Sequence, residues 1–245
     1  MDIKSLNPKI EYEDNDLLVI VKPHGVIVNN AETVKNQETI QNWAEKKIKT
    51  QIEREFGTDF SKKGGIVHRL DKDTSGLLLI AKNQKSFENL QSQFKNRTVN
   101  KKYIVLLHGI VEPKKGTINA PIDRLPWNRE RFGVFPGGRE ARSDYEVLNI
   151  YSDGKNKYSL VEVSPHTGRT HQIRVHFKYL NHSVVGDKLY GGRKQIQYDI
   201  IFCPRQFLHA KSLEIAHPIS GNKMKFESQL SDDLQKILSS LTKES

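Results

Sequence analysis

Three short apolar segments limit most strongly what this chain can fold into. The first, LLVIV, spans residues 17–21 and ends at the turn-forming residues 22–25 (KPHG). The second, LLLIA, spans residues 77–81, and the third, KYIVLLH, spans residues 102–108. Apolar runs this short, bounded by turn residues, are typical of buried β-strands. Two further strands are predicted at residues 144–150 and 158–163.

Helical spacing of apolar residues appears between these strands. Residues 40–56 carry apolar side chains every three or four positions, with Thr39 as the expected N-cap and Gly57 as the expected end. Ser86 is expected to cap a second helix, whose apolar side contains Phe87. Two more helices are predicted, at residues 171–180 and 232–241.

The segment 114–141 differs from the rest, because it is rich in proline, glycine and arginine. It predicts short strands and basic loops. Strands and helices follow one another without strict alternation. The expected fold class is therefore α+β, a single domain around a mixed, largely antiparallel β-sheet with flanking helices and loops.

Composition points to the partner and the compartment. A net charge of +10 and a sequence pI of about 9.5 predict binding to a polyanion. Cys203 is the single cysteine, so no internal disulfide can form and a reducing compartment is expected. The N-terminal residues do not resemble a targeting signal, and no apolar run approaches the roughly 20 residues of a membrane span. We therefore expect a cytoplasmic protein that does not enter a membrane.

A charged loop, HRLDKDTSG, runs directly into the second apolar strand at residues 68–76. A polar group held this close to a core is in a typical position for a catalytic side chain. Asp71 and Asp73 are the candidate carboxylates. Residues 73–76 also match an ordinary turn, which leaves Asp71 as the stronger candidate.

The second polar segment is TGRTHQIRVH, residues 167–176. A helix beginning near Thr170 would place His171, Arg174 and Lys178 on one face. Arg174 would then lie at the rim of the core and reach a carboxylate. The alternative interpretation is a solvated basic face.

Neither a metal nor an organic cofactor is expected. His166, His171 and His176 are spaced five apart, which suits no zinc motif, and the glycine pairs lack the spacing of a phosphate-binding loop. Tyr103 lies on the predicted strand 102–108. Its ring would belong to the core or, facing a pocket, would stack on a flat base.

HRLDKDTSGLLLIAK and TGRTHQIRVH closely resemble the paired motifs of the RluA family of pseudouridine synthases. The resemblance extends from about Glu11 over nearly the whole chain. It is weak over residues 30–65, and residues 164–166 (SPH) depart from the family pattern. The supporting segments, in family order, are EDNDLLVIVKPHGVIV, FENLQSQFKNRTVNKKYIVLLHG, PIDR, GREARSDYEVL, VVGDKLYGG, FLHAKSLEIAHP and MKFESQL.

The resemblance implies an isomerase that acts on ribosomal or transfer RNA. Such an enzyme breaks the glycosidic C–N bond of a uridine and rejoins the base to the ribose through carbon, without a metal or organic cofactor. Asp71 corresponds to the essential aspartate, as covalent nucleophile or as base. Tyr103 corresponds to the residue that stacks on the target base, and Arg174 to the basic partner of the aspartate.

The resemblance also implies a domain organisation and an RNA surface. Residues 1–10 would be an N-terminal extension and residues 11–245 the catalytic domain, with no separate RNA-binding domain before it. RNA contacts would then come from the catalytic domain, and we expect it to act as a monomer. The expected RNA-binding residues are Arg69, which would fill the gap left by a flipped base, and Arg124, Arg139, Arg142, Arg169 and His171.

Two alternative functions remain open at this point. The first is a non-catalytic RNA-binding protein with the same fold, for which the basic charge is equally suitable. The second is a hydrolase that releases the base, with Asp73 or Asp187 as the second carboxylate.

Overall fold

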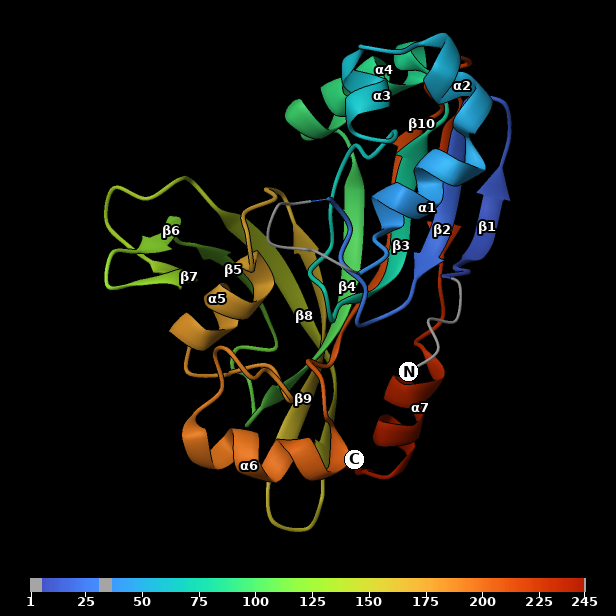
Figure 1. The fold of residues 1–245 in the computed structure, drawn as a ribbon. Coiled ribbons are helices and arrows are strands. Elements are labelled where there is room, and N and C mark those ends of the chain that lie inside the picture. Colours follow the sequence, from blue (N-terminus) through green and yellow to red (C-terminus); the bar gives the residue numbers. More distant parts are fainter. Residues whose placement is uncertain (1–5, 31–36, 245) are drawn as a thin grey trace. The chain divides into compact units, whose positions relative to one another are not determined.

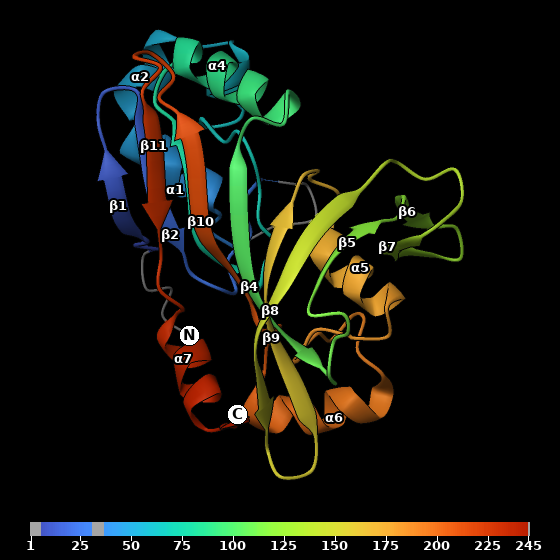
Figure 2. The same ribbon diagram turned by 180° about the vertical axis from the view of Figure 1, so that it is seen from behind.

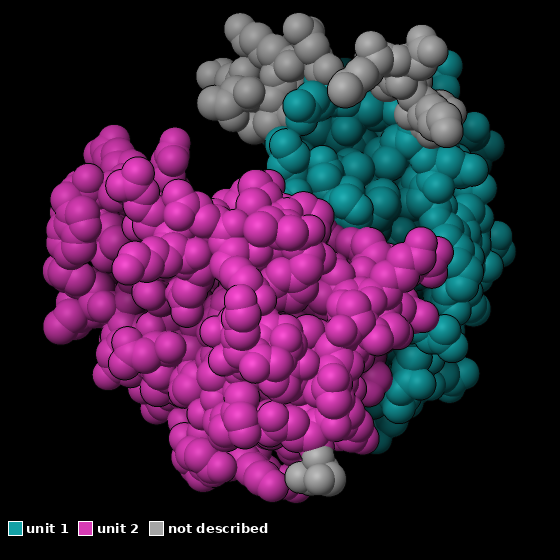
Figure 3. Space-filling model, turned by 90° about the horizontal axis from the view of Figure 1, so that it is seen from below, with its two compact units in different colours: residues 1–100, 212–229 teal, residues 101–211, 230–245 magenta. Residues whose placement is uncertain are grey.

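The computed structural model describes residues 6–30 and 37–244, so the first five residues of the expected N-terminal extension lie outside it. The chain forms two compact units, which Figure 3 shows in different colours. Unit 1 comprises Met1–Asn100 and Ser212–Gln229, and unit 2 comprises Lys101–Lys211 and Leu230–Ser245. The fold class is α+β, as the sequence predicts.

Antiparallel strands form the sheet of unit 1. Strand β2 (Leu17–Lys22) pairs with β1 (Lys9–Glu13) on one side and with β3 (Ser75–Ala81) on the other. Strand β10 (Leu208–Ala216) begins in unit 2 and ends in unit 1, where it pairs with β11 (Lys223–Glu227). The predicted strands 17–21 and 77–81 are thus confirmed, and the structure shows that they are neighbours.

Four helices of unit 1 pack on this sheet: α1 (Ile40–Lys47), α2 (Lys49–Arg54), α3 (Asp59–Lys62) and α4 (Gln84–Lys95). Figure 1 shows them together along β2 and β3. Thr39 caps α1 as predicted, since its hydroxyl accepts the Asn42 N–H at 3.1 Å. The predicted single helix is wrong, because the helix is interrupted at Ile48, and Phe56 lies beyond both pieces with 89% of its surface exposed.

The cap of α4 also differs from the prediction. Asn83, and not Ser86, is the N-cap, because the Asn83 side-chain oxygen accepts the Ser86 N–H at 2.9 Å. Ser86 is already the third residue of the helix, where the backbone N–H needs the capping partner. The apolar side is as expected, with Phe87 and Leu90 buried.

Unit 2 is built on antiparallel strands as well. Strand β9 (Lys157–Pro165) lies between β4 (Asn100–His108) and β8 (Arg142–Ser152). Strands β5 (Lys115–Asn119) and β12 (Thr242–Glu244) pair with β8. Strands β6 (Ile122–Leu125) and β7 (Asn128–Val134) form a separate hairpin, which confirms short strands within residues 114–141.

Helices cover both faces of this part of the sheet (Figures 1 and 2). Val105 and Leu107 of β4 pack with residues of α5 (Gln172–Tyr179), whereas Ile104 and Leu106 pack with residues of α7 (Asp232–Ser239). The alternation follows from the two-residue period of a strand. Helix α6 (Arg193–Phe202) was not predicted. Among the described residues, no helix has the length and apolar character to cross a membrane.

Candidate functional site

The Asp71 loop of unit 1 lies between the residues 66–68 and strand β3. Leu70 is buried, Asp71 is partly buried and Arg69 is exposed. The Thr74 N–H donates to the Asp71 carbonyl at 3.1 Å, which closes a turn over residues 71–74. The loop therefore anchors one side chain in the core and leaves the neighbouring carboxylate near the surface.

Lys22 holds this loop from inside unit 1. Its side chain is completely buried, and its Nζ donates to the carbonyl oxygens of Pro23 and Val26 at 2.8 Å and of Lys72 at 2.9 Å. For a buried ammonium, hydrogen bonds to several carbonyl oxygens replace most of the hydrogen bonds to water that burial removes. Lys22 thus ties the Asp71 loop to the turn after β2, a role that the sequence analysis did not assign to it.

Helix α5 of unit 2 begins two residues after Thr170, near which the sequence predicts its start. His171 precedes the helix in the left-handed conformation with φ 56°, so the first helical residue is Gln172. The Gln172 amide donates to the Arg142 carbonyl at 3.0 Å and to the Ser143 hydroxyl at 2.9 Å, while its oxygen accepts from the Thr167 hydroxyl at 2.7 Å. These bonds fix the start of the helix.

Arg174 is buried, with 6% of its surface exposed. Its Nε and Nη2 donate to the two carboxylate oxygens of Asp187 at 2.7 and 2.9 Å. Asp187 also accepts the backbone N–H groups of Leu189 and Tyr190 at 2.9 and 3.1 Å. A solvated basic face is therefore wrong for Arg174, although Lys178 on the same helix is exposed. A bidentate ion pair with Asp187 therefore fixes the guanidinium of Arg174.

Tyr190 extends this arrangement. Its hydroxyl lies 2.9 Å from the His171 Nδ1, and the Arg174 guanidinium lies 5.0 Å from its ring centre. Sequence reasoning treated Asp187 only as a possible second carboxylate and did not single out Tyr190. Both stand in VVGDKLYGG, where a lone acidic residue after apolar ones was the available signal.

The predicted RNA-binding residues of unit 2 lie around the β6–β7 hairpin and the ends of β8 and α5. Arg124 lies 5.2 Å from the Phe132 ring centre, and the Phe132 N–H donates to the Tyr190 hydroxyl at 3.0 Å. The hairpin is thereby connected to α5. Trp127, in the turn of the hairpin, is 74% exposed and was missed by the sequence analysis. Arg139 and Arg142 are exposed with Arg124, whereas Arg169 and His171 are partly buried.

The predicted catalytic residues belong to different units. Asp71 lies in unit 1, together with Arg69, whereas Tyr103 and Arg174 lie in unit 2. Tyr103 is partly buried on β4, opposite Val163 of β9, and packs against the cluster that contains Ile173 of α5. Within unit 2, Tyr103 therefore packs against the cluster to which α5 contributes, and Arg174 is a residue of that helix.

Three histidines considered for zinc have separate protein partners. His166 contacts Asp144, and hydrogen bonds from Thr117 and His166 lower the pKa of Asp144 although its partial burial alone would raise it. His176 is buried between the Ser143 hydroxyl and the Ala120 carbonyl. In the described part of the chain, one group of side chains has metal-ligand spacing, formed by Asp14, Asp16 and His217 in unit 1.

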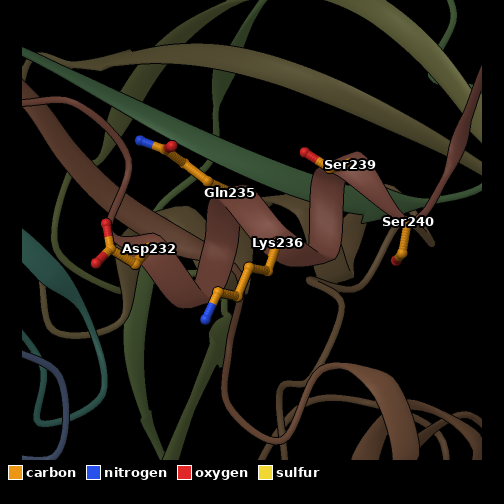
Figure 4. A pocket seen from close by; sticks show the side chains of 5 residues that line it. All are labelled: Asp232, Gln235, Lys236, Ser239 and Ser240. Atoms are coloured by element: carbon orange, nitrogen blue, oxygen red, sulfur yellow. The ribbon is translucent and has the colours of Figure 1, made fainter.

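A shallow hollow on α7 is lined by Asp232, Gln235, Lys236, Ser239 and Ser240 (Figure 4). None of the predicted site residues lines it. The hollow is therefore not part of the candidate site.

Residues 16–179 match the family model described as RNA pseudouridylate synthase. The match contains the Asp71 loop, Tyr103 and the whole of α5. The chain belongs to this family. Its members are isomerases, and the matched region includes both motifs on which the resemblance rests.

Several bacterial RNA pseudouridine synthases are similar over most of this chain. A protein of Bacillus subtilis named uncharacterized RNA pseudouridine synthase YlyB is 38% identical over 96% of this chain and 73% of its own length. The ribosomal large subunit pseudouridine synthase D of Nitrosomonas europaea is 37% identical over 95% of this chain, which spans 65% of that relative. The curated relatives are thus longer than this chain.

Solved structures of the family have the same fold. The human RNA pseudouridylate synthase domain containing 1 protein is 26% identical, with a TM-score of 0.75 over 98% of this chain and 89% of that chain. The human domain containing 4 protein, 22% identical, gives a TM-score of 0.72 over 97% and 94%. The α+β architecture is thus that of the pseudouridylate synthases.

Proposed function

We propose that this chain converts specific uridines of ribosomal or transfer RNA into pseudouridine, with residues 11–245 acting as one catalytic domain. Two relatives, from Nitrosomonas europaea and Pseudomonas aeruginosa, are named ribosomal large subunit pseudouridine synthase D. Their names favour ribosomal RNA as the substrate. The single cysteine and an RNA substrate both suit the cytoplasm, where we propose that the enzyme acts as a monomer without a metal or organic cofactor.

In this proposal Asp71 is the essential carboxylate, Tyr103 stacks on the target base and Arg174 is the basic partner of Asp71. The N1–C1′ bond of the uridine breaks, the base turns, and a C5–C1′ bond forms while C5 loses a proton and N1 gains one. Asp71 would act as nucleophile at the sugar or as base. Arg174 beside the carboxylate would orient it toward the reacting uridine in either role.

The observation that carries the proposal is the environment of Arg174. A buried guanidinium held on both oxygens of Asp187 and next to the Tyr190 ring has one fixed direction. Fixed side chains of this kind are expected where a charge must be oriented toward a reacting group. A module that only binds RNA has no need for Asp71, Tyr103 and Arg174 together.

The RNA surface of the proposal combines four exposed arginines and the partly buried Arg169 with one exposed aromatic ring. Arg69, Arg124, Arg139, Arg142 and Arg169 would contact phosphates, His171 would contribute at the start of α5, and Trp127 would stack on an unpaired base. A uridine in a helix has to be flipped out to react, so contacts of this kind would hold the RNA around it. Arg69 would occupy the position of the flipped base.

Asp71→Asn tests the proposal, because asparagine keeps the shape of the side chain and removes its charge. We expect the turnover of Asp71→Asn to fall at least about 100-fold while RNA affinity stays at or slightly above that of the wild type. Asp73→Asn is the matched control, since it removes a carboxylate two residues away and should leave turnover nearly unchanged. The measurement is the fraction of pseudouridine at each uridine after incubation with unmodified ribosomal and transfer RNA.

Wild-type turnover by Asp71→Asn would contradict the assignment of Asp71. Release of free uracil would indicate the hydrolase, with Asp73 as its second carboxylate if Asp73→Asn abolishes the release. RNA binding without any pseudouridine from the wild type would indicate a binding protein with the same fold.

A further inference from the structure

Two adjacent lysines at the start of β4 have different surroundings. Lys102 is 48% exposed, and its Nζ lies 2.6 Å from Glu162 on β9. Lys211 lies 3.2 Å from the other oxygen of the same carboxylate. Lys101 is partly buried, and within residues 6–30 and 37–244 no hydrogen bond or ion pair engages its ammonium group. The protein thus neutralises one of the two lysines and not the other.

Partial burial without an anionic partner changes the pKa of Lys101. Burial lowers the pKa of Lys101 to about 8, and no charged or hydrogen-bonding neighbour contributes to the shift. An ammonium that has lost part of its hydration without gaining an anion destabilises the free protein. Side chains with such a disadvantage are frequent at functional sites, where the missing partner arrives with the ligand.

The position of Lys101 relates it to Tyr103. Side chains two residues apart on a strand point to the same face, so Lys101 and Tyr103 stand next to each other, about 7 Å apart along β4. The same row continues with Val105 and Leu107, which are buried under α5. On this face of β4, Lys101 is therefore the polar end of a row of side chains, and the Tyr103 ring stands next to it.

We propose that Lys101 binds a backbone phosphate of the nucleotide whose base stacks on Tyr103, or of the nucleotide next to it. The inference rests on the proposed function, in which Tyr103 receives the target base. A phosphodiester is the anion that RNA supplies at every nucleotide, within one sugar of each base. A lysine binds it as a point charge with three donors and needs no fixed orientation of the phosphate.

Three variants test this contact in a salt titration of binding to an unmodified transcript of large-subunit ribosomal RNA. Lys101→Met should bind about 10-fold more weakly near physiological salt, and its slope of log K against log salt should be smaller by about 0.7. Lys101→Arg should bind like the wild type. Lys102→Met is the matched control and should change neither quantity appreciably, because Lys102 is exposed and already paired with Glu162.

Stability and kinetics separate a binding role from a structural one. Lys101→Met should melt at the wild-type temperature or higher, because methionine has a similar length and no charge to desolvate. Loss of a phosphate contact that is equally strong in the ground state and the transition state raises KM and leaves kcat unchanged. A lower melting temperature, or a fall in kcat alone, would overturn the proposal.

The decisive measurement replaces the phosphate itself. In a stem-loop around the uridine modified by the wild-type enzyme, single phosphates next to that uridine are exchanged for uncharged methylphosphonates. At one position the wild type should lose about 10-fold in affinity, whereas Lys101→Met should lose nothing further at that position. Equal losses in the two proteins at every position would contradict the contact.

Failure of this inference can be told apart from failure of the proposed function. If the wild type makes pseudouridine and Lys101→Met binds with the wild-type salt slope, only the phosphate contact is wrong. If the wild type makes no pseudouridine, the salt titration still decides the role of Lys101, because it measures RNA binding and not turnover.

Discussion

The Asp71 loop and helix α5 hold their polar side chains by different means. In the loop, Lys22 donates to backbone carbonyl oxygens, one of them the carbonyl of Lys72 in the loop itself. On α5, the contacts of Arg174 and Gln172 include side chains, those of Asp187, Ser143 and Thr167. The contacts of Lys22 therefore use backbone atoms that every residue provides, whereas those of Arg174 and Gln172 also use side chains that only particular residues provide.

This difference predicts which substitutions each region tolerates. Carbonyl oxygens persist when neighbouring residues change, so substitutions in the loop leave the acceptors of Lys22 in place. Helix α5 depends on both members of each pair, because removing one leaves a buried charge or amide without its partner. Of the three substitutions below, in order of expected effect, the first two break such contacts and the third replaces a buried histidine of α5.

Asp187→Asn should have the largest effect on stability. It removes the charge that neutralises the buried guanidinium of Arg174, and breaking a buried ion pair costs about 3–5 kcal/mol. The measurement is the free energy of unfolding from urea denaturation. Glu146→Gln is the control, because it breaks the exposed pair with Lys115 and should cost about 0–1 kcal/mol. Equal losses in the two variants would show that α5 does not depend on this pair.

Lys22→Met should have a smaller effect on stability and a local effect on the Asp71 loop. It removes the ammonium group that donates to three carbonyl oxygens, which should cost about 2 kcal/mol, and it releases the turn at residues 71–74. Faster hydrogen exchange at the Thr74 amide measures that release.

Lys82→Met is the control for Lys22→Met. Lys82 is also buried, but its Nζ binds Glu13 and the Asp14 carbonyl and not the loop. Its replacement should lower stability while the Thr74 amide keeps its protection. Unchanged exchange at Thr74 in Lys22→Met would show that Lys22 does not hold the loop.

His176→Gln should have the smallest effect, visible only as a change in pH dependence. Burial lowers the pKa of His176, and its hydrogen bond to the Ala120 carbonyl offsets this only in part. Below about pH 6.5, His176 therefore binds a proton in the unfolded chain before it does so in the folded chain. This contribution to stability is present above that pH and is lost as the pH falls through the folded pKa.

Unfolding free energies measured from pH 7 to pH 5 check this prediction. Those of His176→Gln should decline less steeply than those of the wild type. Glutamine can still donate to the Ala120 carbonyl, so the fold should persist. Identical slopes would show that His176 does not contribute to acid sensitivity.

The sequence predicted the elements whose signals are local. The apolar runs at residues 17–21 and 77–81 became β2 and β3, because a strand buried on both faces leaves no position for a polar residue. Thr39 was identified as a cap because the capping bond joins residues three apart. Where two polar residues competed for a cap, at Asn83 and Ser86, composition alone did not decide between them.

The sequence by itself also determined the family, since HRLDKDTSG and TGRTHQIRVH are long, specific motifs, and it indicated Asp71, Tyr103 and Arg174 as the catalytic candidates. Only the tertiary structure decided the partners: Arg174 binds Asp187, Lys22 binds the carbonyl of Lys72, and Lys101 has none among the described residues. The physical reason is distance along the chain. Charged side chains are placed by segments that meet only after folding, whereas periodicity and turn chemistry act between neighbours.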